Sequence, residues 1–165
     1  MPFNFPQDSP HLIPAEWLAQ HLEDAQVRIL DARLPENYAE GHIPLAVHVQ
    51  LTALRYNRDG VDGMLIEPDV FAEAAQRLGI GADTLVVVYD DYYGQLAARI
   101  GWSLLRYGHD KVALLDGGWE AWEAAGLQVS TEVKQPEPAS FVPVLVEKHI
   151  AEHAWVVEHL HTPDV

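Results

Sequence analysis

The sequence predicts an α/β domain with a mainly parallel central sheet, flanked by helices on both faces and followed by a C-terminal linker and helix. Three observations lead to this prediction. Short apolar runs alternate with stretches of helical periodicity, glycines stand at the ends of these stretches, and residues 84–89 form a continuous valine-rich run. A run of this kind is typical of a central parallel strand that is covered on both faces.

Proline, glycine and apolar spacing set the bounds of the predicted elements. Pro14 and Pro68 each open a helix, and Gly79, Gly108 and Gly126 each end one. The expected order is helix 14–22, strand 27–30, strand 46–49, helix 68–78, strand 84–89, a helix of about four turns that contains 96–105, strand 111–115 and helix 119–125. In parallel sheets, sites form where strands end, which singles out the loops that come directly after the strands.

Composition excludes several classes of function. The chain has 165 residues and a formal net charge of 10 − 25 = −15, which repels nucleic acid and anionic membrane surfaces, so we expect neither as a partner. The sequence has neither an apolar run of membrane-spanning length nor a secretion signal, and we expect a cytoplasmic protein. It contains no cysteine, which fits a reducing compartment.

The chain divides into three predicted parts. Residues 1–131 make up the domain, and the proline-rich residues 132–146 are interpreted as an extended linker. Residues 147–165 resume a helical pattern over 147–160 but are too few to form a second core, so we interpret them as the truncated start of a second domain. The run 149–153 matches a His-x-x-Glu-His zinc pattern, but a catalytic zinc needs a third ligand, and we expect no metal.

Several short motifs occur in a fixed order along the chain. They are Val27-Arg28-Ile29-Leu30-Asp31-Ala32-Arg33, Tyr38-Ala39-Glu40-Gly41-His42-Ile43-Pro44, the valine strand with Tyr89-Asp90-Asp91, Ala98-Arg99 with Trp102, Arg106-Tyr107-Gly108-His109, and Leu115-Asp116-Gly117-Gly118 with Trp122 and Gly126. Each motif alone is weak. Together, from about Leu12 to Val129, they resemble the rhodanese domain, specifically the amino-terminal half of tandem thiosulfate or 3-mercaptopyruvate sulfurtransferases.

The resemblance implies a chemistry that this chain lacks. In such tandem proteins the second domain carries a catalytic cysteine, which takes sulfur from thiosulfate or 3-mercaptopyruvate and passes it to cyanide or a thiol without a cofactor. Here Asp90 stands at the position of that cysteine. Only the thiolate of a cysteine can carry sulfur as a persulfide, so Asp90 cannot replace it. Asp90 and Asp91 would also repel the anionic sulfur donors, so we expect the chain alone to be inactive.

The aspartates at the strand ends allow two interpretations. Asp90 acting as a phosphoryl-transfer nucleophile would need Mg²⁺ and further acids such as Asp31 and Asp116, but residues to bind the phosphate are not evident. We favour the interpretation in which Asp31 and Asp116 tie the loops by hydrogen bonds.

The remaining candidate residues lie around the loop after the central strand. Tyr92, Tyr93 and Gly94 form its tip, where the tyrosines either pack against a second domain or are simply exposed. We expect Arg99 to form an ion pair with Asp90 or Asp91.

The motif around His42 offers a further candidate. The resemblance places His42 near the active loop of a partner domain, but we favour a structural histidine that fixes its own loop. Leu45 replaces the glycine that usually comes after His-Ile-Pro in this family, and we expect it to change the local turn.

These observations support two functions of different classes. The first is the non-catalytic half of a tandem sulfurtransferase, which shapes the cleft and stabilises a catalytic second rhodanese domain. The alternative is a free-standing binding or regulatory module. The tail favours the first, because it carries an apolar set too large to leave exposed: Val142, Val144, Leu145, Val146, Ile150, Trp155, Val156 and Leu160. Self-association through the tail would cover the same surface.

Overall fold

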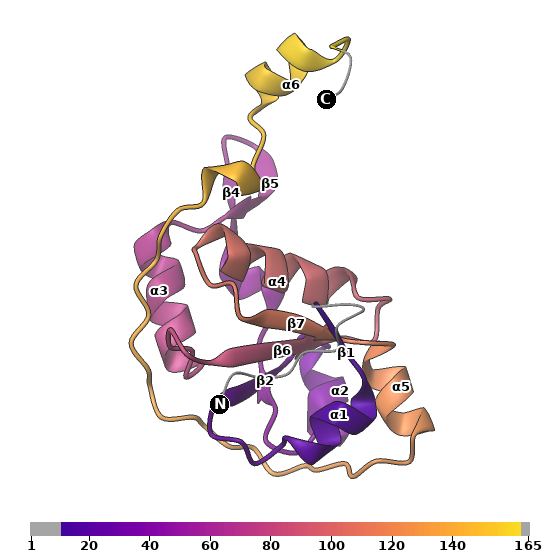
Figure 1. The fold of residues 1–165 in the computed structure, drawn as a ribbon. Coiled ribbons are helices and arrows are strands. Elements are labelled where there is room, and N and C mark those ends of the chain that lie inside the picture. Colours follow the sequence, from indigo (N-terminus) through magenta and orange to yellow (C-terminus); the bar gives the residue numbers. More distant parts are fainter. Residues whose placement is uncertain (1–10, 163–165) are drawn as a thin grey trace.

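The computed structural model describes residues 11–162 and confirms the predicted α/β architecture (Figure 1). Its main sheet is parallel, with the strand order β1-β7-β6-β2-β3. The elements of the sheet and of its covering helices are β1 (Leu12–Ile13), α1 (Ala15–Gln20), β2 (Val27–Asp31), α2 (Pro35–Glu40), β3 (Val47–His48), α3 (Pro68–Arg77), β6 (Leu85–Tyr89), α4 (Gln95–Arg106), β7 (Val112–Leu115) and α5 (Gly118–Ala124). The outermost residues of the predicted ranges 1–131 and 147–165 lie outside the described residues.

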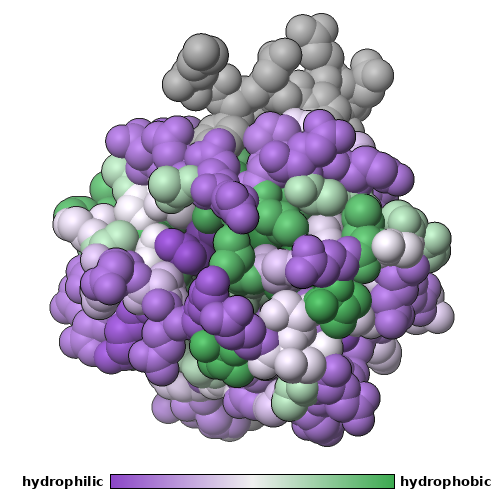
Figure 2. Space-filling view, turned by 90° about the horizontal axis from the view of Figure 1, so that it is seen from below, coloured by the Kyte–Doolittle hydropathy of each residue, from purple (hydrophilic) through white to green (hydrophobic). Residues whose placement is uncertain are grey.

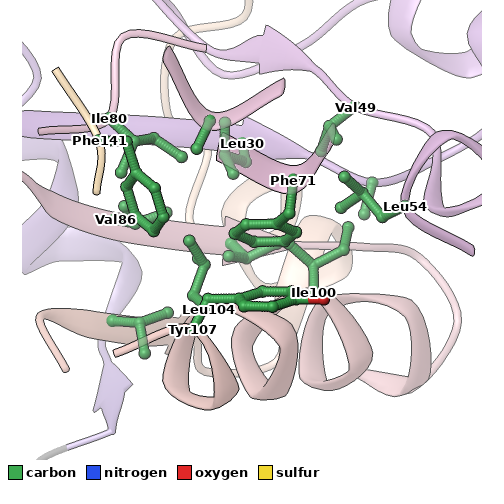
Figure 3. Close-up of a cluster of buried hydrophobic side chains, with 14 of the residues drawn as sticks. Leu30, Val49, Leu54, Phe71, Ile80, Val86, Ile100, Leu104, Tyr107 and Phe141 are labelled. Atoms are coloured by element: carbon green, nitrogen blue, oxygen red, sulfur yellow. The ribbon is translucent and has the colours of Figure 1, made fainter. Parts of the chain in front are cut away.

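The alternation of side chains along the strands divides the apolar residues between two cores. On one face, α3 and α4 cover the sheet, and Leu104 packs with Val86 in a cluster shown in Figure 3. On the other face, α1 and α5 contribute Leu18 and Trp122, which pack with Val87. Every residue of β6 is fully buried, as predicted for a central strand covered on both sides.

Several elements were missed by the sequence analysis. Besides α2, these include a 3-10 helix, η1 (Leu51–Leu54), and a hairpin of β4 (Arg55–Arg58) and β5 (Val61–Leu65). The hairpin turns at Asp59 and Gly60, which have φ of 53° and 84°. Asp-Gly is a strong hairpin signal because both residues tolerate the positive φ angles that the turn requires. The pair is visible in the sequence, so this hairpin could have been predicted.

The predicted helix 147–160 is wrong as a single element. It is divided into a 3-10 helix, η2 (Glu147–His149), and α6 (His153–His159), with extended backbone at Ile150. The physical reason is a tertiary hydrogen bond. The indole nitrogen of Trp102 donates to the carbonyl of His149 at 3.0 Å, which binds η2 to α4 before α6 begins.

The predicted linker is extended, but it packs along the domain. We call residues 132–149 the strap (Figure 1). The strap passes α3, where the backbone N–H of Ala139 donates to the carbonyl of Gln76 at 3.1 Å. Phe141 then inserts its ring into the core beside Phe71 and is only 6% exposed (Figure 3).

The second half of the strap runs beside the end of α4. The backbone N–H groups of Val144 and Val146 donate to the carbonyls of Tyr107 and Arg106 at 3.0 and 2.9 Å. Gly108 has a φ of 84°, and a Cβ there would lie 2.8 Å from the carbonyl oxygen of Val144. The close approach of the strap therefore requires glycine at this position.

Within residues 11–162, none of the helices is both long and apolar enough to cross a bilayer.

We predict that the strap is needed for stability through Phe141. Phe141→Ala should lower the free energy of unfolding by about 3–5 kcal/mol, since it removes a buried aromatic ring and leaves a cavity. The neighbouring Val142 is 77% exposed, and Val142→Ala should change stability by less than about 0.5 kcal/mol. Urea denaturation measures the free energy of unfolding of both variants and of the unchanged chain. Equal, small effects would show that the strap is not part of the core.

We predict that His109 makes stability depend on pH. Burial lowers the pKa of His109, and its Nε2 is buried without a hydrogen-bond partner among residues 11–162. Because its pKa is lower in the folded than in the unfolded chain, the unfolded chain binds the proton first as pH falls. Stability should therefore decrease below about pH 6.5, by at most about 1.4 kcal/mol per pH unit for one proton.

The measurement is urea denaturation between pH 7.5 and pH 5. His109→Leu should have a shallower pH dependence than the unchanged chain. His161→Leu, which alters an exposed histidine, should keep the original dependence. A His109→Leu variant with an unaltered pH profile would contradict the prediction.

Candidate functional site

A crevice of about 470 Å³ opens at the carboxyl ends of β6 and β7. It is lined by residues 89–91, 93–94, 97–98 and 114–118, together with Leu12 and Glu120. Tyr89 is fully buried, yet it is the last residue of β6 and belongs to the crevice wall. The crevice lies at the end of the sheet where the sequence predicts a site.

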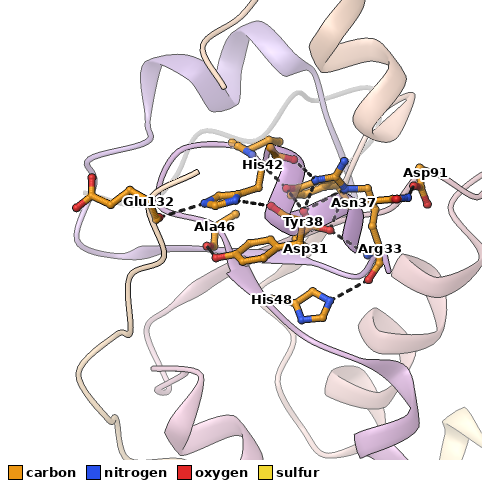
Figure 4. Close-up of polar contacts among 12 residues, drawn as sticks. Asp31, Arg33, Asn37, Tyr38, His42, Ala46, His48, Asp91 and Glu132 are labelled. Carbon is orange, nitrogen blue, oxygen red and sulfur yellow. Dashed lines mark hydrogen bonds and ion pairs between the residues drawn. The ribbon is translucent and has the colours of Figure 1, made fainter. Parts of the chain in front are cut away.

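A buried ion pair lies behind the crevice, at the end of β2. Asp31 accepts hydrogen bonds from Nε and Nη2 of Arg33, of which the Nη2 bond to Oδ2 is 2.7 Å long (Figure 4). It also accepts a hydrogen bond from the hydroxyl of Tyr89. Arg33 further donates to the carbonyl of Gly41 at 2.6 Å. The guanidinium carbon of Arg33 stacks 3.9 Å from the ring centroid of Trp119. Asp31 therefore does tie strand-end loops by hydrogen bonds, as predicted.

Burial and charge fix the protonation states in this network. Burial acts to lower the pKa of Arg33, but the hydrogen bonds and charge of Asp31 prevail and raise it. Burial, reinforced by the negative charge of Asp31, raises the pKa of Tyr89 well above its usual range. Arg33 is therefore charged and Tyr89 neutral, so Tyr89 acts as a hydrogen-bond donor and is unsuited to act as a base at neutral pH.

The carboxylate of Asp90 is turned into its own loop. Its Oδ1 accepts the backbone N–H groups of Tyr92 and Gly94 at 3.0 and 2.8 Å, and its Oδ2 accepts that of Ala97 at 2.9 Å. Asp90 is only 2% exposed. The expectation that both loop carboxylates would face a substrate is therefore wrong for Asp90. The amide groups that would hold an anion already hold this carboxylate.

The backbone of Asp90 is fixed from the opposite side. Its carbonyl accepts the N–H of Trp119 at 2.9 Å. Gly118 has a φ of 57°, and a Cβ there would lie 2.4 Å from the same carbonyl oxygen. The Gly117-Gly118 motif is therefore explained by the close contact between the start of α5 and the loop.

Of the other loop residues, Asp91, Tyr93 and Gly94 line the crevice, whereas Tyr92 is not part of its lining. Asp91 accepts a hydrogen bond from the side-chain amide of Asn37 at 2.6 Å. Tyr92 and Tyr93 are both exposed, Tyr93 to 92%, and Gly94 is the N-cap of α4 in the left-handed conformation. Asp116 is exposed, and only its backbone N–H, which donates to the carbonyl of Ile13, forms a hydrogen bond among residues 11–162, so the prediction that its side chain ties the loop is not confirmed. The charged residues that line the crevice are all acidic, namely Asp90, Asp91, Asp116 and Glu120.

The ion pair predicted for Arg99 is wrong. Arg99 donates to the carbonyl of Gly63 in the β4–β5 hairpin at 2.7 Å and stacks 4.4 Å from the ring centroid of Trp102. It cannot pair with Asp90 because that carboxylate faces the loop amides. Burial, together with the nearby charge of Arg55, lowers the pKa of Arg99.

His42 lies away from the crevice, in a fully buried position. Its Nδ1 and Nε2 lie 2.9 and 3.1 Å from the carbonyl oxygens of Tyr38 and Glu132, and its ring stacks on that of Tyr38 (Figure 4). These contacts fix the start of the strap to α2. In this chain the arrangement supports a structural role for His42.

Leu45 adopts a backbone conformation that favours glycine. Its φ is 67°, in the left-handed region, which is a strained conformation for a leucine. The turn after His42-Ile43-Pro44 thus uses a glycine-like conformation, at a cost of about 1–2 kcal/mol.

The side chains around the crevice limit the chemistry that the site can perform. Within residues 11–162, there is no group of three or more His, Cys, Asp or Glu placed to hold a metal ion. The loop amides are already occupied, and the sequence has no cysteine to carry sulfur. The site therefore presents an acidic loop that is stabilised by backbone amide groups.

The contacts of Asn37 and Phe141 and the stacking of Arg33 on Trp119 were not predicted from the sequence. Arg33 was visible as the last residue of an Asp-x-Arg motif at the end of a strand. The partners Asn37 and Trp119 come from distant segments, and no local pattern identifies them.

Comparisons with known proteins agree with this architecture. The model of the rhodanese-like domain family matches residues 14–125. The 3-mercaptopyruvate sulfurtransferase of Escherichia coli is 34% identical over 150 residues, which cover 82% of this chain and 53% of that protein. The sulfur carrier protein TtuD of Thermus thermophilus is 35% identical over 156 residues, which cover 90% of this chain and 52% of that protein.

A solved structure of a sulfurtransferase has the same fold as this chain. The crystal structure of SseA from Escherichia coli superposes with a TM-score of 0.83 at 29% identity, covering 92% of this chain and 62% of that chain. The chain thus spans about half the length of these two curated relatives.

We predict that Asp90 stabilises the loop as an internal anion. Asp90→Ala should lower the free energy of unfolding by at least about 2 kcal/mol, since it leaves three amide groups without an acceptor. Asp91→Ala, which loses only the bond to Asn37, should cost about 1 kcal/mol or less. Sulfate should raise the melting temperature of Asp90→Ala more than that of the unchanged chain, because the vacated amides can bind an oxyanion.

Urea denaturation gives the stabilities, and thermal melts with sodium sulfate or sodium chloride at equal ionic strength give the anion effect. An Asp90→Ala variant that is as stable as Asp91→Ala and gains nothing specific from sulfate would contradict this role.

Proposed function

This chain belongs to the rhodanese-like domain family, and from that premise we propose that it is the non-catalytic, amino-terminal half of a tandem sulfurtransferase. The proposed complete protein is of the thiosulfate or 3-mercaptopyruvate type, with its sulfur-carrying cysteine in sequence beyond residue 165. This half would shape the cleft and stabilise the catalytic half.

One observation carries the proposal. At the position where the resemblance expects the catalytic cysteine, the carboxylate of Asp90 fills the amide cradle of its own loop. A sulfur carrier needs a thiolate there, with the amides free to stabilise negative charge. The described loop is instead closed and stabilised, as suits a domain that supports catalysis elsewhere.

In the complete protein the expected reaction proceeds in two steps. A thiolate attacks the sulfane sulfur of thiosulfate and releases sulfite, or takes the sulfur of 3-mercaptopyruvate and releases pyruvate. The resulting persulfide then gives its outer sulfur to cyanide, forming thiocyanate, or to a thiol, and the thiolate is regenerated. In this proposal the acidic loop of this chain neither accepts sulfur from the donor nor passes it to the acceptor.

We predict that the 165-residue chain alone does not form thiocyanate from thiosulfate and cyanide, because it has no thiol to carry sulfur. The measurement is colorimetric detection of thiocyanate, with the natural gene product as the positive control.

The intact mass of that product should exceed that of the 165-residue chain. Its sequence after Val165 should contain a further strand, an Asp-x-Arg motif and a cysteine-containing loop. Turnover by the 165-residue chain, or a natural product that ends at Val165, would overturn the proposal in favour of a free-standing module.

A further inference from the structure

A second pocket opens at the amino end of the sheet, opposite the crevice. Its volume is about 220 Å³, and it lies where β2 begins. The ladder between β2 and β3 starts only at Leu30, so residues 27–29 have no strand on that side within residues 11–162. This free edge offers backbone hydrogen-bonding groups to the pocket. The lining consists of residues 22–25, 27–29 and 134–136 together with Leu45 and Val47.

Arg28 lines this pocket and is a half-buried cation without a partner. Its Nε is buried without an acceptor among residues 11–162, and its guanidinium takes part in none of the ion pairs there. In contrast, the buried Arg33 and Arg106 pair with Asp31 and Glu147. Partial burial of a positive charge costs free energy unless an opposite charge offsets it. An anion from outside the domain would provide the missing partner.

The guanidinium of Arg28 is held in place by its neighbours. Gly79 has a φ of 71°, and a Cβ there would lie 3.0 Å from Nη2 of Arg28 and 2.8 Å from Cβ of Pro136. The guanidinium is therefore close to both the end of α3 and the strap. Burial lowers the pKa of Arg28, but an arginine stays charged at neutral pH. A cation fixed in this way loses little conformational freedom when an anion binds.

The other charged residues of the lining limit the charge of a ligand. Lys134 pairs with Glu132 at 3.7 Å, so its charge is partly offset. Glu23 and Asp24 line the pocket from the exposed loop after α1, where the carboxylate of Asp24 accepts the backbone N–H of Gln26 at 3.0 Å. These two carboxylates would repel a polyphosphate or another multiply charged anion. The pocket therefore suits a ligand with a single negative charge.

The rest of the lining is largely apolar, and the space is small. The apolar residues are Leu22, Ala25, Val27, Ile29, Leu45, Val47 and Pro136. Since one water molecule occupies about 30 Å³ in the liquid, the pocket holds a ligand of about seven non-hydrogen atoms. Figure 2 shows the side on which α1 and the start of the strap lie in Figure 1, and its surface is mainly hydrophilic, with apolar residues interspersed. This side therefore suits a small molecule better than a protein partner.

The conformation of Leu45 is a second, independent observation. Its φ of 67° is strained for a leucine, and a glycine would adopt the same turn without that strain. Leu45 borders both this pocket and a neighbouring one of about 190 Å³. Strained residues cluster at positions that hold ligands. The strained leucine is therefore explained if its side chain serves as an apolar wall.

We propose that this pocket is a binding site for a small monocarboxylate with a short apolar chain. The carboxylate pairs with Arg28, and the chain lies against Leu45. The site is independent of the proposed function, because it lies at the opposite end of the sheet from the crevice. It gives a role to an unpaired arginine and a strained leucine, neither of which the fold requires.

Nuclear magnetic resonance of the ¹⁵N-labelled 165-residue chain tests the site with butanoate as the probe. Butanamide is the matched neutral probe, and sodium chloride keeps the ionic strength equal. We expect butanoate, but not butanamide, to move the Nε–H signal of Arg28 and the backbone signal of Leu45 in a saturable manner. Arg28→Met should weaken butanoate binding about tenfold or more, because it removes a charged hydrogen bond. The control Arg58→Met alters an exposed arginine and should bind butanoate as the unchanged chain does.

Two further measurements separate a ligand site from a purely structural arginine. In urea and without ligand, Arg28→Met should be at least as stable as the unchanged chain, because it removes an unpaired charge. Leu45→Gly should weaken butanoate binding several-fold. The proposal is wrong if butanoate causes no saturable shift, if butanamide or sodium sulfate acts equally well, or if Arg28→Met binds butanoate normally. A large loss of stability in Arg28→Met, with no butanoate shift in the unchanged chain, would assign Arg28 a structural role instead.

Discussion

A single buried carboxylate organises the strand-end face of this domain. Asp31 joins the end of β2 to the end of β6 through Tyr89, and through Arg33 it reaches Gly41 and Trp119. Loss of one partner of a buried ion pair typically costs about 3–5 kcal/mol, because the other charge is left uncompensated. The loop that begins at Asp90 comes directly after Tyr89, so its position depends on this network.

The loop after β6 shows how residue identity decides which anion the backbone amides hold. Backbone amides gathered at the start of a helix can stabilise an anion, and a thiolate at the same place would become reactive. Here the anion is the carboxylate of Asp90, which bonds to two amides of its own loop and to one in the first turn of α4. The result is a loop whose amide groups are satisfied by its own carboxylate and whose surroundings are acidic.

The strap joins the domain to helix α6. It is extended, as a linker would be, but it contributes Phe141 to the core and bonds to α3 and α4. Its start is fixed by His42 and its end by Trp102. A segment held at both ends restricts the relative placement of a second unit far more than a flexible linker does.

The layout of the fold could be predicted from the residues alone. Apolar periodicity, together with the prolines and glycines that open and end elements, identified the central strand β6 and the helices beside it, because burial of a face imposes a local repeat. The presence of an aspartate after β6 and the lack of a sulfur carrier were equally evident, since these are properties of residue identity.

The partners of the polar groups, in contrast, were set by the tertiary structure. Asn37 donates to Asp91, Arg99 donates to the hairpin, and a bond from Trp102 divides the predicted helix 147–160. A hydrogen bond requires two atoms to lie within about 3 Å of each other, and these atoms often belong to segments remote in sequence. Local patterns of residues carry no information about such distances.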